Sequence, residues 1–98
     1  MLNNLDYQDY VLEINTKFYL AETGFELELI EVTETTISPH QEMFSLIFQG
    51  VKDNFLEQGI YPLRHKKLGE GELFLVPIAE DPDGFKYEAL FNRLIATS

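Results

Sequence analysis

The last third of the chain constrains the fold more than any other segment. An apolar run over residues 73–78 is followed by the turn sequence Asp81-Pro82-Asp83-Gly84 and by a second apolar segment over residues 85–92. Proline at the second turn position and glycine at the fourth are typical of a type I turn that ends in a left-handed glycine. The two apolar segments are therefore predicted to pair as an antiparallel hairpin.

This turn also predicts a register for the hairpin. A glycine bulge at Gly84 would place Asp81 opposite Phe85 and Glu80 opposite Lys86, so that a cross-strand ion pair supports the alignment. The same register pairs residues farther from the turn: Pro77 with Ala89, and Leu75 with Phe91.

Side-chain alternation along the two strands divides their apolar residues into two layers. One layer is predicted to face the core and consists of Leu73, Leu75, Tyr87, Ala89 and Phe91. The other layer lies on the opposite face and consists of Phe74, Val76, Ile78 and Leu90. The second layer needs a cover, and any part left exposed is a candidate surface for self-association or for a protein partner.

The first half of the chain predicts one short helix and a second hairpin. Polar caps and apolar spacing over residues 4–14 indicate a helix of about two turns. Residues 17–21 and 25–29 read as strands joined by a turn at 22–24. The apolar parity changes after Leu29, so Ile30 and Val32 either follow a β-bulge that turns them inward or lie on the outer face under a loop.

The middle of the chain predicts two further strands. Residues 43–50 place Phe44, Leu46 and Phe48 on one face of a buried strand, after a loop over residues 35–41. Residues 51–59 read as a loop or one helical turn, with Phe55 and Leu56 as anchors. A strand over residues 60–67 and a turn over 68–71 follow. Pro62 and Pro77 each require an edge or a gap in the hydrogen-bond ladder.

These segments predict a mainly β protein with a single domain over residues 1–98. About six to seven short antiparallel strands joined by tight turns, with one short N-terminal helix, favour a small β-barrel over a compact sandwich. A barrel also leaves no exposed strand edges. Eight Phe and five Tyr, with no Trp, are expected to build much of the core.

Composition narrows the function classes. The chain has no cysteine, which excludes disulfides, thiolate metal sites and cysteine nucleophiles. Its formal net charge of −10 opposes binding to nucleic acid and to anionic membranes and favours solubility over steering toward a basic partner. The longest apolar stretch, residues 73–79, is far shorter than the roughly 20 residues of a membrane helix. We therefore expect a cytoplasmic protein.

Several segments together carry a family resemblance. They are Phe44-Ser45-Leu46-x-Phe48-x-Gly50, Tyr61-x-Leu63-x-His65-x-x-Leu68-Gly69, the run from Leu73 to Ile78, and Tyr87-Glu88-Ala89-x-Phe91-Asn92. In this combination, from about Phe18 to Asn92, the chain resembles a small bacterial domain family of unknown function, some of whose members are encoded beside proteins similar to phage tail-collar modules. Asn15 and Val51 depart from the pattern, where a Gly and a Pro are common. The resemblance implies a shared fold and a role near a phage-tail-like assembly, and no catalytic residues.

The polar residues that invite a chemical function have structural explanations. Ser45 lies in a strand pattern and not on a nucleophile elbow. His65 is expected to be partly buried and hydrogen-bonded to backbone, and its distance in sequence from His40 gives no metal-binding motif. The sequence Glu80 to Gly84 resembles the start of a calcium loop, but turn chemistry accounts for it. Glu70 and Glu72 are expected to neutralise the basic cluster Arg64 to Lys67.

We therefore expect no enzyme activity, no cofactor and no metal site. The leading hypothesis is a non-catalytic interaction or assembly module that acts through Phe74, Val76, Ile78 and Leu90 as part of a phage-tail-like or surface structure. The alternative is a β-barrel that holds a small apolar ligand in an aromatic-lined cavity. A third hypothesis, an enzyme that uses His65 and nearby carboxylates, has the least support.

Overall fold

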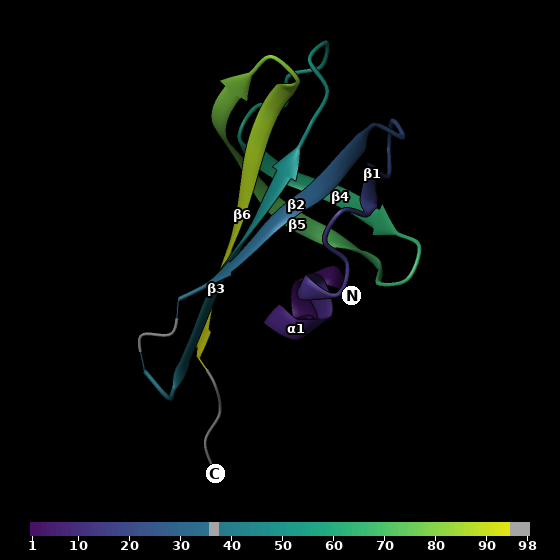
Figure 1. Cartoon of the computed structure of the whole chain (residues 1–98). Helices are drawn as coiled ribbons and strands as arrows, with labels where there is room; N and C mark the ends of the chain where they lie inside the picture. Colours follow the sequence, from purple (N-terminus) through teal and green to yellow (C-terminus); the bar gives the residue numbers. More distant parts are fainter. Residues whose placement is uncertain (36–37, 95–98) are drawn as a thin grey trace.

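The computed structural model describes residues 1–35 and 38–94, and its strands close into an antiparallel barrel (Figure 1). The strands follow one another around the barrel in the order β1-β2-β3-β6-β5-β4, and β4 returns to β1. The predicted barrel, and not a sandwich, is thereby confirmed. In the described residues the elements are η1 (Leu2–Asn4), α1 (Tyr7–Val11), β1 (Lys17–Leu20), β2 (Glu26–Glu34), β3 (Gln41–Gln49), β4 (Gly59–His65), β5 (Gly69–Asp81) and β6 (Gly84–Leu94).

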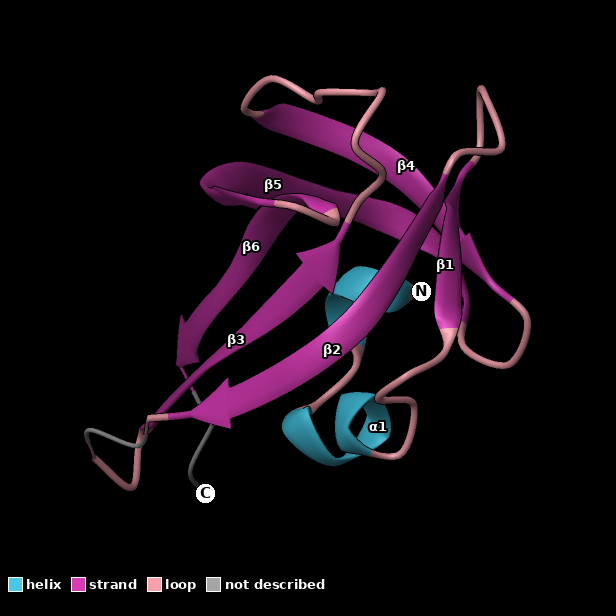
Figure 2. Ribbon diagram, turned by 45° about the horizontal axis from the view of Figure 1, so that its top comes forward, coloured by secondary structure: helices cyan, strands magenta, loops and turns pink. Residues whose placement is uncertain are grey.

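The N-terminal helix is shorter than two turns. A capping box between Asp6 and Asp9 starts α1, because each carboxylate accepts a hydrogen bond from the other's backbone amide. Asn15 then takes a positive φ of 74°, a conformation that glycine and asparagine tolerate best. Figure 2 shows η1 and α1 at one end of the barrel.

The predicted β-bulge in β2 is confirmed. The register between β2 and β3 shifts between Leu29 and Glu31, so Ile30 is the extra residue. After the shift Val32 packs against the core, which is the inward direction that the changed parity required.

The barrel interior is filled by large side chains. Phe44, Leu46 and Phe48 are all buried on the inner face of β3, as their alternation predicted. Phe18 from β1 meets the Phe48 ring edge-on at a centroid distance of 5.2 Å. Tyr10 from α1 is fully buried against the same cluster, and its hydroxyl donates to the Leu2 carbonyl, so the helical segment belongs to the core.

The predicted register of the closing hairpin is wrong. Glu80 pairs with Phe85 and Asp81 with Gly84, so the connection is only the two residues Pro82 and Asp83. The Asp81 carboxylate accepts hydrogen bonds from the amides of Asp83 and Gly84, which tightens the turn. Lys86 was predicted to pair with Glu80. The Lys86 ammonium instead lies 3.1 Å from the Asp81 carboxylate.

The core face of the hairpin was nevertheless predicted correctly. A second register shift, between Pro77 and Ala79, leads to the pairs Pro77–Tyr87 and Val76–Glu88. This alignment differs from the predicted one by two residues, which is one full period of a strand, so the same side chains face inward. Pro77 adjoins this bulge, where the ladder tolerates a missing donor.

The connecting segments follow the prediction in outline. Residues 50–58 contain neither helix nor strand, and in this loop Leu56 packs against the core while Phe55 lies edge-on to the Phe85 ring at 5.0 Å. The loop before β3 ends one residue early, because β3 already begins at Gln41. Residues 36–37 of that predicted loop lie outside the described residues.

Candidate interaction surface

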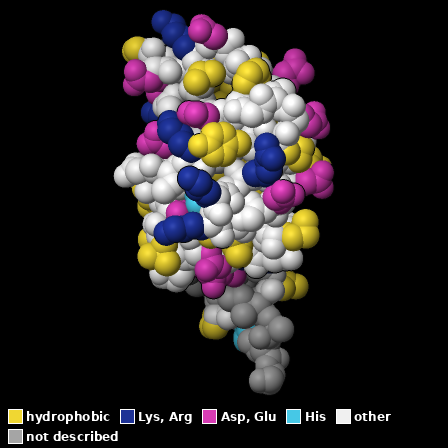
Figure 3. Space-filling model, turned by 90° about the vertical axis from the view of Figure 1, so that its right-hand side faces the viewer, with side chains coloured by type: hydrophobic (Ala, Val, Ile, Leu, Met, Phe, Trp, Pro, Cys, Tyr) yellow, Lys and Arg dark blue, Asp and Glu magenta, His cyan; other side chains and the backbone are white. Residues whose placement is uncertain are grey.

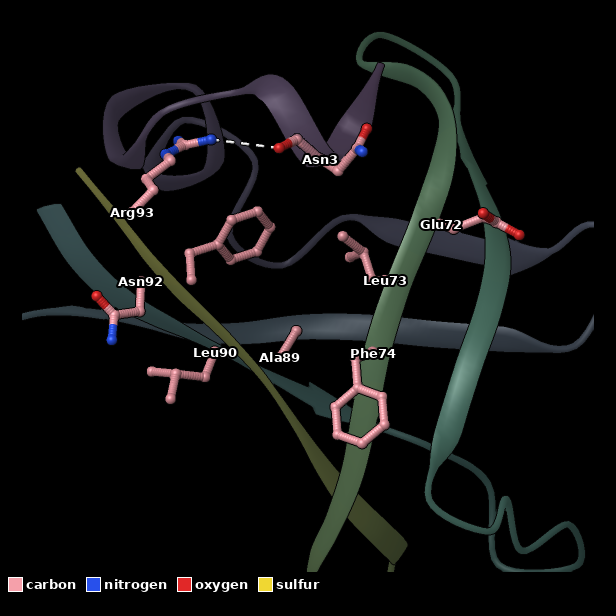
Figure 4. Close-up of a pocket in the computed structure, with 9 residues that line it drawn as sticks. Asn3, Glu72, Leu73, Phe74, Ala89, Leu90, Asn92 and Arg93 are labelled. Atoms are coloured by element: carbon pink, nitrogen blue, oxygen red, sulfur yellow. Dashed lines mark hydrogen bonds between the residues drawn. The ribbon is translucent and has the colours of Figure 1, made fainter. Parts of the chain in front are cut away.

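The outer face of β4, β5 and β6 carries a group of exposed apolar side chains. The exposed fraction is 66% for Ile60, 48% for Phe74, 48% for Ile78 and 58% for Leu90, while Val76 is half-buried. We call these five residues the outer patch. Figure 4 shows Phe74 on β5 and Leu90 on β6, both on the side away from the core residues Leu73 and Ala89.

Four of the five residues were predicted from the sequence, and Ile60 was missed. Ile60 pairs with Phe74 in the β4–β5 register and extends the patch to a third strand. The signal was available, because Ile60 has the opposite parity to the inward-facing Leu63 and His65. The parity of a single residue at a strand end predicts little until the neighbouring strand is known.

The N-terminal segment does not cover the outer patch. Within the described residues, η1 packs on the inner side of β5, where a Cβ on Gly71 would meet the Leu2 backbone nitrogen at 2.6 Å. The helix α1 contacts β2. Both helical elements therefore serve the barrel interior, and the described part of the chain leaves the patch open.

One carboxylate lies within the apolar surroundings of the patch. Glu88 is half-buried and pairs with Val76 on one side and with Ile47 on the other, and it precedes Leu90 by two positions on the same face. Among the described residues no cation forms an ion pair with Glu88. Glu88 was not predicted as a functional residue, because its surroundings depend on two cross-strand registers.

A groove opens beside the patch, where β5 and β6 diverge. Their pairing ends at Val76 and Glu88, although β5 continues along β4 and β6 along β3. The hollow between them has a volume of about 290 Å³, and Phe74 and Leu90 line it. Its other lining residues include Leu73, Ala89, Asn92 and Asn3 (Figure 4).

Arg93 closes the far end of this groove. Its guanidinium donates hydrogen bonds to the backbone carbonyls of Asn3 and Leu5, and its Nε lies 3.3 Å from the Glu42 carboxylate. The same group lies 5.5 Å from the ring centroids of both Phe44 and Phe91. Arg93 thus ties the N-terminal segment to the last strand.

His65 is buried, with a 6% exposed fraction, and both ring nitrogens have partners. Nδ1 accepts hydrogen bonds from the amides of Lys67 and Leu68, each at 3.1 Å. Nε2 lies 2.8 Å from the Thr16 hydroxyl, whose own proton is donated to the Glu13 carbonyl, so Nε2 carries the hydrogen. The expected backbone-bonded histidine is confirmed, and this arrangement leaves no ring lone pair free to take a proton.

The surroundings of His65 favour its neutral form. Burial lowers the pKa of His65, while the Glu13 carboxylate, 3.5 Å from Nε2, acts to raise this pKa and is the weaker influence. The ring also packs against Phe18 at a centroid distance of 4.4 Å. Glu13 and Thr16 were missed by sequence reasoning, because 49 residues separate Thr16 from His65.

Lysine and arginine side chains gather around a histidine on one face of the molecule (Figure 3). A hollow of about 270 Å³ on the surface is lined by Lys17, Lys66, Lys67 and the His65 ring. Of the predicted basic cluster Arg64 to Lys67, Arg64 lies opposite Glu70 in the β4–β5 register, but among the described residues no ion pair within 4.0 Å joins the cluster to Glu70 or Glu72. Glu13 lies 4.0 Å from Lys67, and Glu28 lies 3.1 Å from Lys17.

The other predicted polar positions occupy ordinary places in the fold. Ser45 lies in β3, paired with Thr33 and Leu90. The Asp81 carboxylate caps its own turn. The hydrogen bond that it accepts from Lys86 is the main reason why the pKa of Asp81 is lowered.

In residues 1–35 and 38–94 no three His, Cys, Asp or Glu side chains are grouped so that they could hold a metal ion. Over the same ranges, neither helical element has the length and apolar character needed to cross a membrane.

Comparison with known proteins yields one match. The model of a family described as "Domain of unknown function (DUF6916)" matches residues 5–91. No curated protein and no solved structure matches the chain.

Proposed function

The chain belongs to the DUF6916 family of domains of unknown function, and we propose that it acts as a non-catalytic protein-interaction or assembly module. The observation that carries this proposal is the outer patch, a group of apolar side chains on three neighbouring strands, of which four are about half exposed. Small soluble proteins rarely expose such a set unless it serves an interface.

The patch can supply useful binding energy. Complete burial of a Leu, Ile or Phe side chain is worth about 1.5 to 3 kcal/mol. Four side chains of the patch are already about half buried, so covering each would add about 1 kcal/mol, before the entropic cost of association. This is enough for the centre of a small interface when polar contacts surround it.

The finer assignment rests on the resemblance described above. Some members of the resembling family are encoded beside proteins similar to phage tail-collar modules. This supports a role in a phage-tail-like assembly or a surface structure. The expectation of a cytoplasmic protein is part of the same proposal.

The small-ligand alternative has less support. The inner faces of the strands are occupied by buried aromatic rings, among them Phe18, Phe44, Phe48 and Tyr87. A mostly apolar hollow lined by Leu20, Phe25, Leu56 and Tyr61 has a volume of about 100 Å³, below the roughly 300 Å³ at which ligand pockets usually begin.

A paired substitution tests the proposal. The double variant Phe74→Ser/Leu90→Ser should lose the proteins that co-purify with the wild type, or the oligomer seen by light scattering. It should stay folded, with a free energy of unfolding lowered by about 1.5 to 3 kcal/mol because both side chains are about half buried. Leu12→Ser is the matched control, because Leu12 is 79% exposed on the helical end of the barrel. The proposal is wrong if the double variant keeps every association of the wild type.

A further inference from the structure

Glu88 constrains what can cover the outer patch. Its half-buried carboxylate lies between Val76 and Ile47 and beside Leu90, so a partner that covers these side chains also removes water from Glu88. Burying a carboxylate without a hydrogen-bond or charge partner is costly enough to cancel the gain from several apolar contacts. The described part of the chain offers this carboxylate no ion pair. Lys86, two positions before Glu88 on the same face, is already paired with Asp81, so a partner that supplies its own cation would offset this cost.

Carboxylates outnumber cations around the patch, and the cation that β4 places on this face, Arg64, lies opposite Glu70 in the β4–β5 register. Exposed Glu72 precedes Phe74 by two positions on the outer face of β5, and exposed Glu70 precedes it by four. Lys86 points to the same face, but its ammonium already pairs with Asp81 at 3.1 Å. The outer patch is thus an apolar surface with an acidic rim and an acidic centre.

We infer that the outer patch binds a protein segment in which apolar side chains alternate with or adjoin lysine or arginine, with one cation placed against Glu88. This inference rests on the proposed function and names the chemistry of its partner. The apolar side chains of the segment cover Phe74 and Leu90, and its cations face Glu88 and Glu72. Such complementarity sets specificity and the rate of association more than raw affinity.

A second copy of the chain fits the patch poorly. Each copy carries a formal charge of −10, and an isologous contact would bring two Glu88 carboxylates and two acidic rims together. Two of the cations around the His65 hollow, Lys17 and Lys67, are already paired with Glu28 and Glu13. Charge complementarity therefore favours a different, cationic partner.

Two short synthetic peptides test the inference with the intact protein. One alternates lysine with leucine, and the other alternates serine with leucine. The lysine–leucine peptide should bind at least tenfold more tightly, measured by fluorescence anisotropy, and its affinity should fall as salt is raised. Glu88→Gln should weaken this peptide by about tenfold, the effect of losing one well-placed charged contact, and should improve binding of the serine–leucine peptide.

Two control variants separate the possible results. Glu34→Gln removes one charge from an exposed position on β2 and should leave both affinities within about twofold of wild type. Phe74→Ser/Leu90→Ser should abolish binding of the lysine–leucine peptide. If this double variant binds the peptide as tightly as wild type, the patch is no interface and the proposed function fails.

The inference alone fails under either of two other outcomes. In the first, Phe74→Ser/Leu90→Ser no longer binds the lysine–leucine peptide, but Glu88→Gln binds it as tightly as Glu34→Gln does. Binding would then require the apolar patch but no cation opposite Glu88. In the second, light scattering at low salt shows a dimer of the wild type that Phe74→Ser/Leu90→Ser converts to monomer, which makes a second copy the occupant.

Discussion

Substitution of Gly84 by alanine probes a close approach between the backbone of β6 and residues 50–52. Gly84 begins β6 with a φ of 142°, a region that residues with a Cβ rarely adopt. A Cβ built there would lie 2.2 Å from the Gly50 carbonyl oxygen and 2.9 Å from the Lys52 nitrogen. Both obstacles are backbone atoms, so no side-chain rotation relieves them.

The expected cost has two parts. The unfavourable φ accounts for about 1 to 3 kcal/mol. Relief of the clash requires residues 50–52 to move away from β6, which breaks the 2.7 Å hydrogen bond from the Gly50 amide to the Phe85 carbonyl and costs a further 0.5 to 1.5 kcal/mol or so. We therefore expect Gly84→Ala to lower the free energy of unfolding by about 1.5 to 4.5 kcal/mol.

Gly24→Ala separates the two parts. Gly24 also has a positive φ, 77°, but an added Cβ there would have no heavy atom within 4 Å. Its substitution should cost only the conformational term of about 1 to 2 kcal/mol. Denaturant unfolding of both variants gives the comparison. A cost for Gly84→Ala that lies within about 0.5 kcal/mol of the cost for Gly24→Ala would refute the close-approach argument.

Two further predictions concern the core and pH. Leu75→Ala should lower the free energy of unfolding by about 2 to 5 kcal/mol, because Leu75 is fully buried, whereas Leu12→Ala should change it by less than about 0.5; equal effects in denaturant melts would mean that Leu75 is not a core residue. The pKa of His65 is lowered in the fold, so the unfolded chain binds the proton first and stability should fall as pH drops below about 6.5, with full stability above it. Thermal melts between pH 7.5 and 5.5 should show this slope, and a slope just as steep in His65→Gln would assign it to other groups.

The general fold was predictable because local patterns determine it. Alternation in β3 identified Phe44, Leu46 and Phe48, and the parity change after Leu29 identified the bulge in β2. The closing hairpin shows the limit of such patterns. Its turn residues were recognised, but the Asp81 carboxylate binds the amides of the turn and selects a shorter connection. Side-chain capping of this kind competes with backbone turn preferences and cannot be ranked from the sequence alone.

The candidate surface was predictable in part for the same reason. Phe74, Val76, Ile78 and Leu90 share a face by alternation within one hairpin. The contribution of Ile60 and the surroundings of Glu88 depend instead on which strands become neighbours around the barrel. That information is not local, and it appears only once the barrel order is known.

The contact of Arg93 with the N-terminal segment has a consequence for folding kinetics. The hydrogen bond from its guanidinium to the Leu5 carbonyl joins residues 88 positions apart. Closing a loop of that length costs about 4 kcal/mol of chain entropy, far more than closing the two-residue connection between β5 and β6. The β5–β6 hairpin can therefore form early and on its own. The contact between Arg93 and the N-terminal segment forms only after β1 to β4 have brought the two ends of the chain together. The rate of that late step, and not the rate of hairpin formation, should set how long the aromatic interior stays open to water during folding.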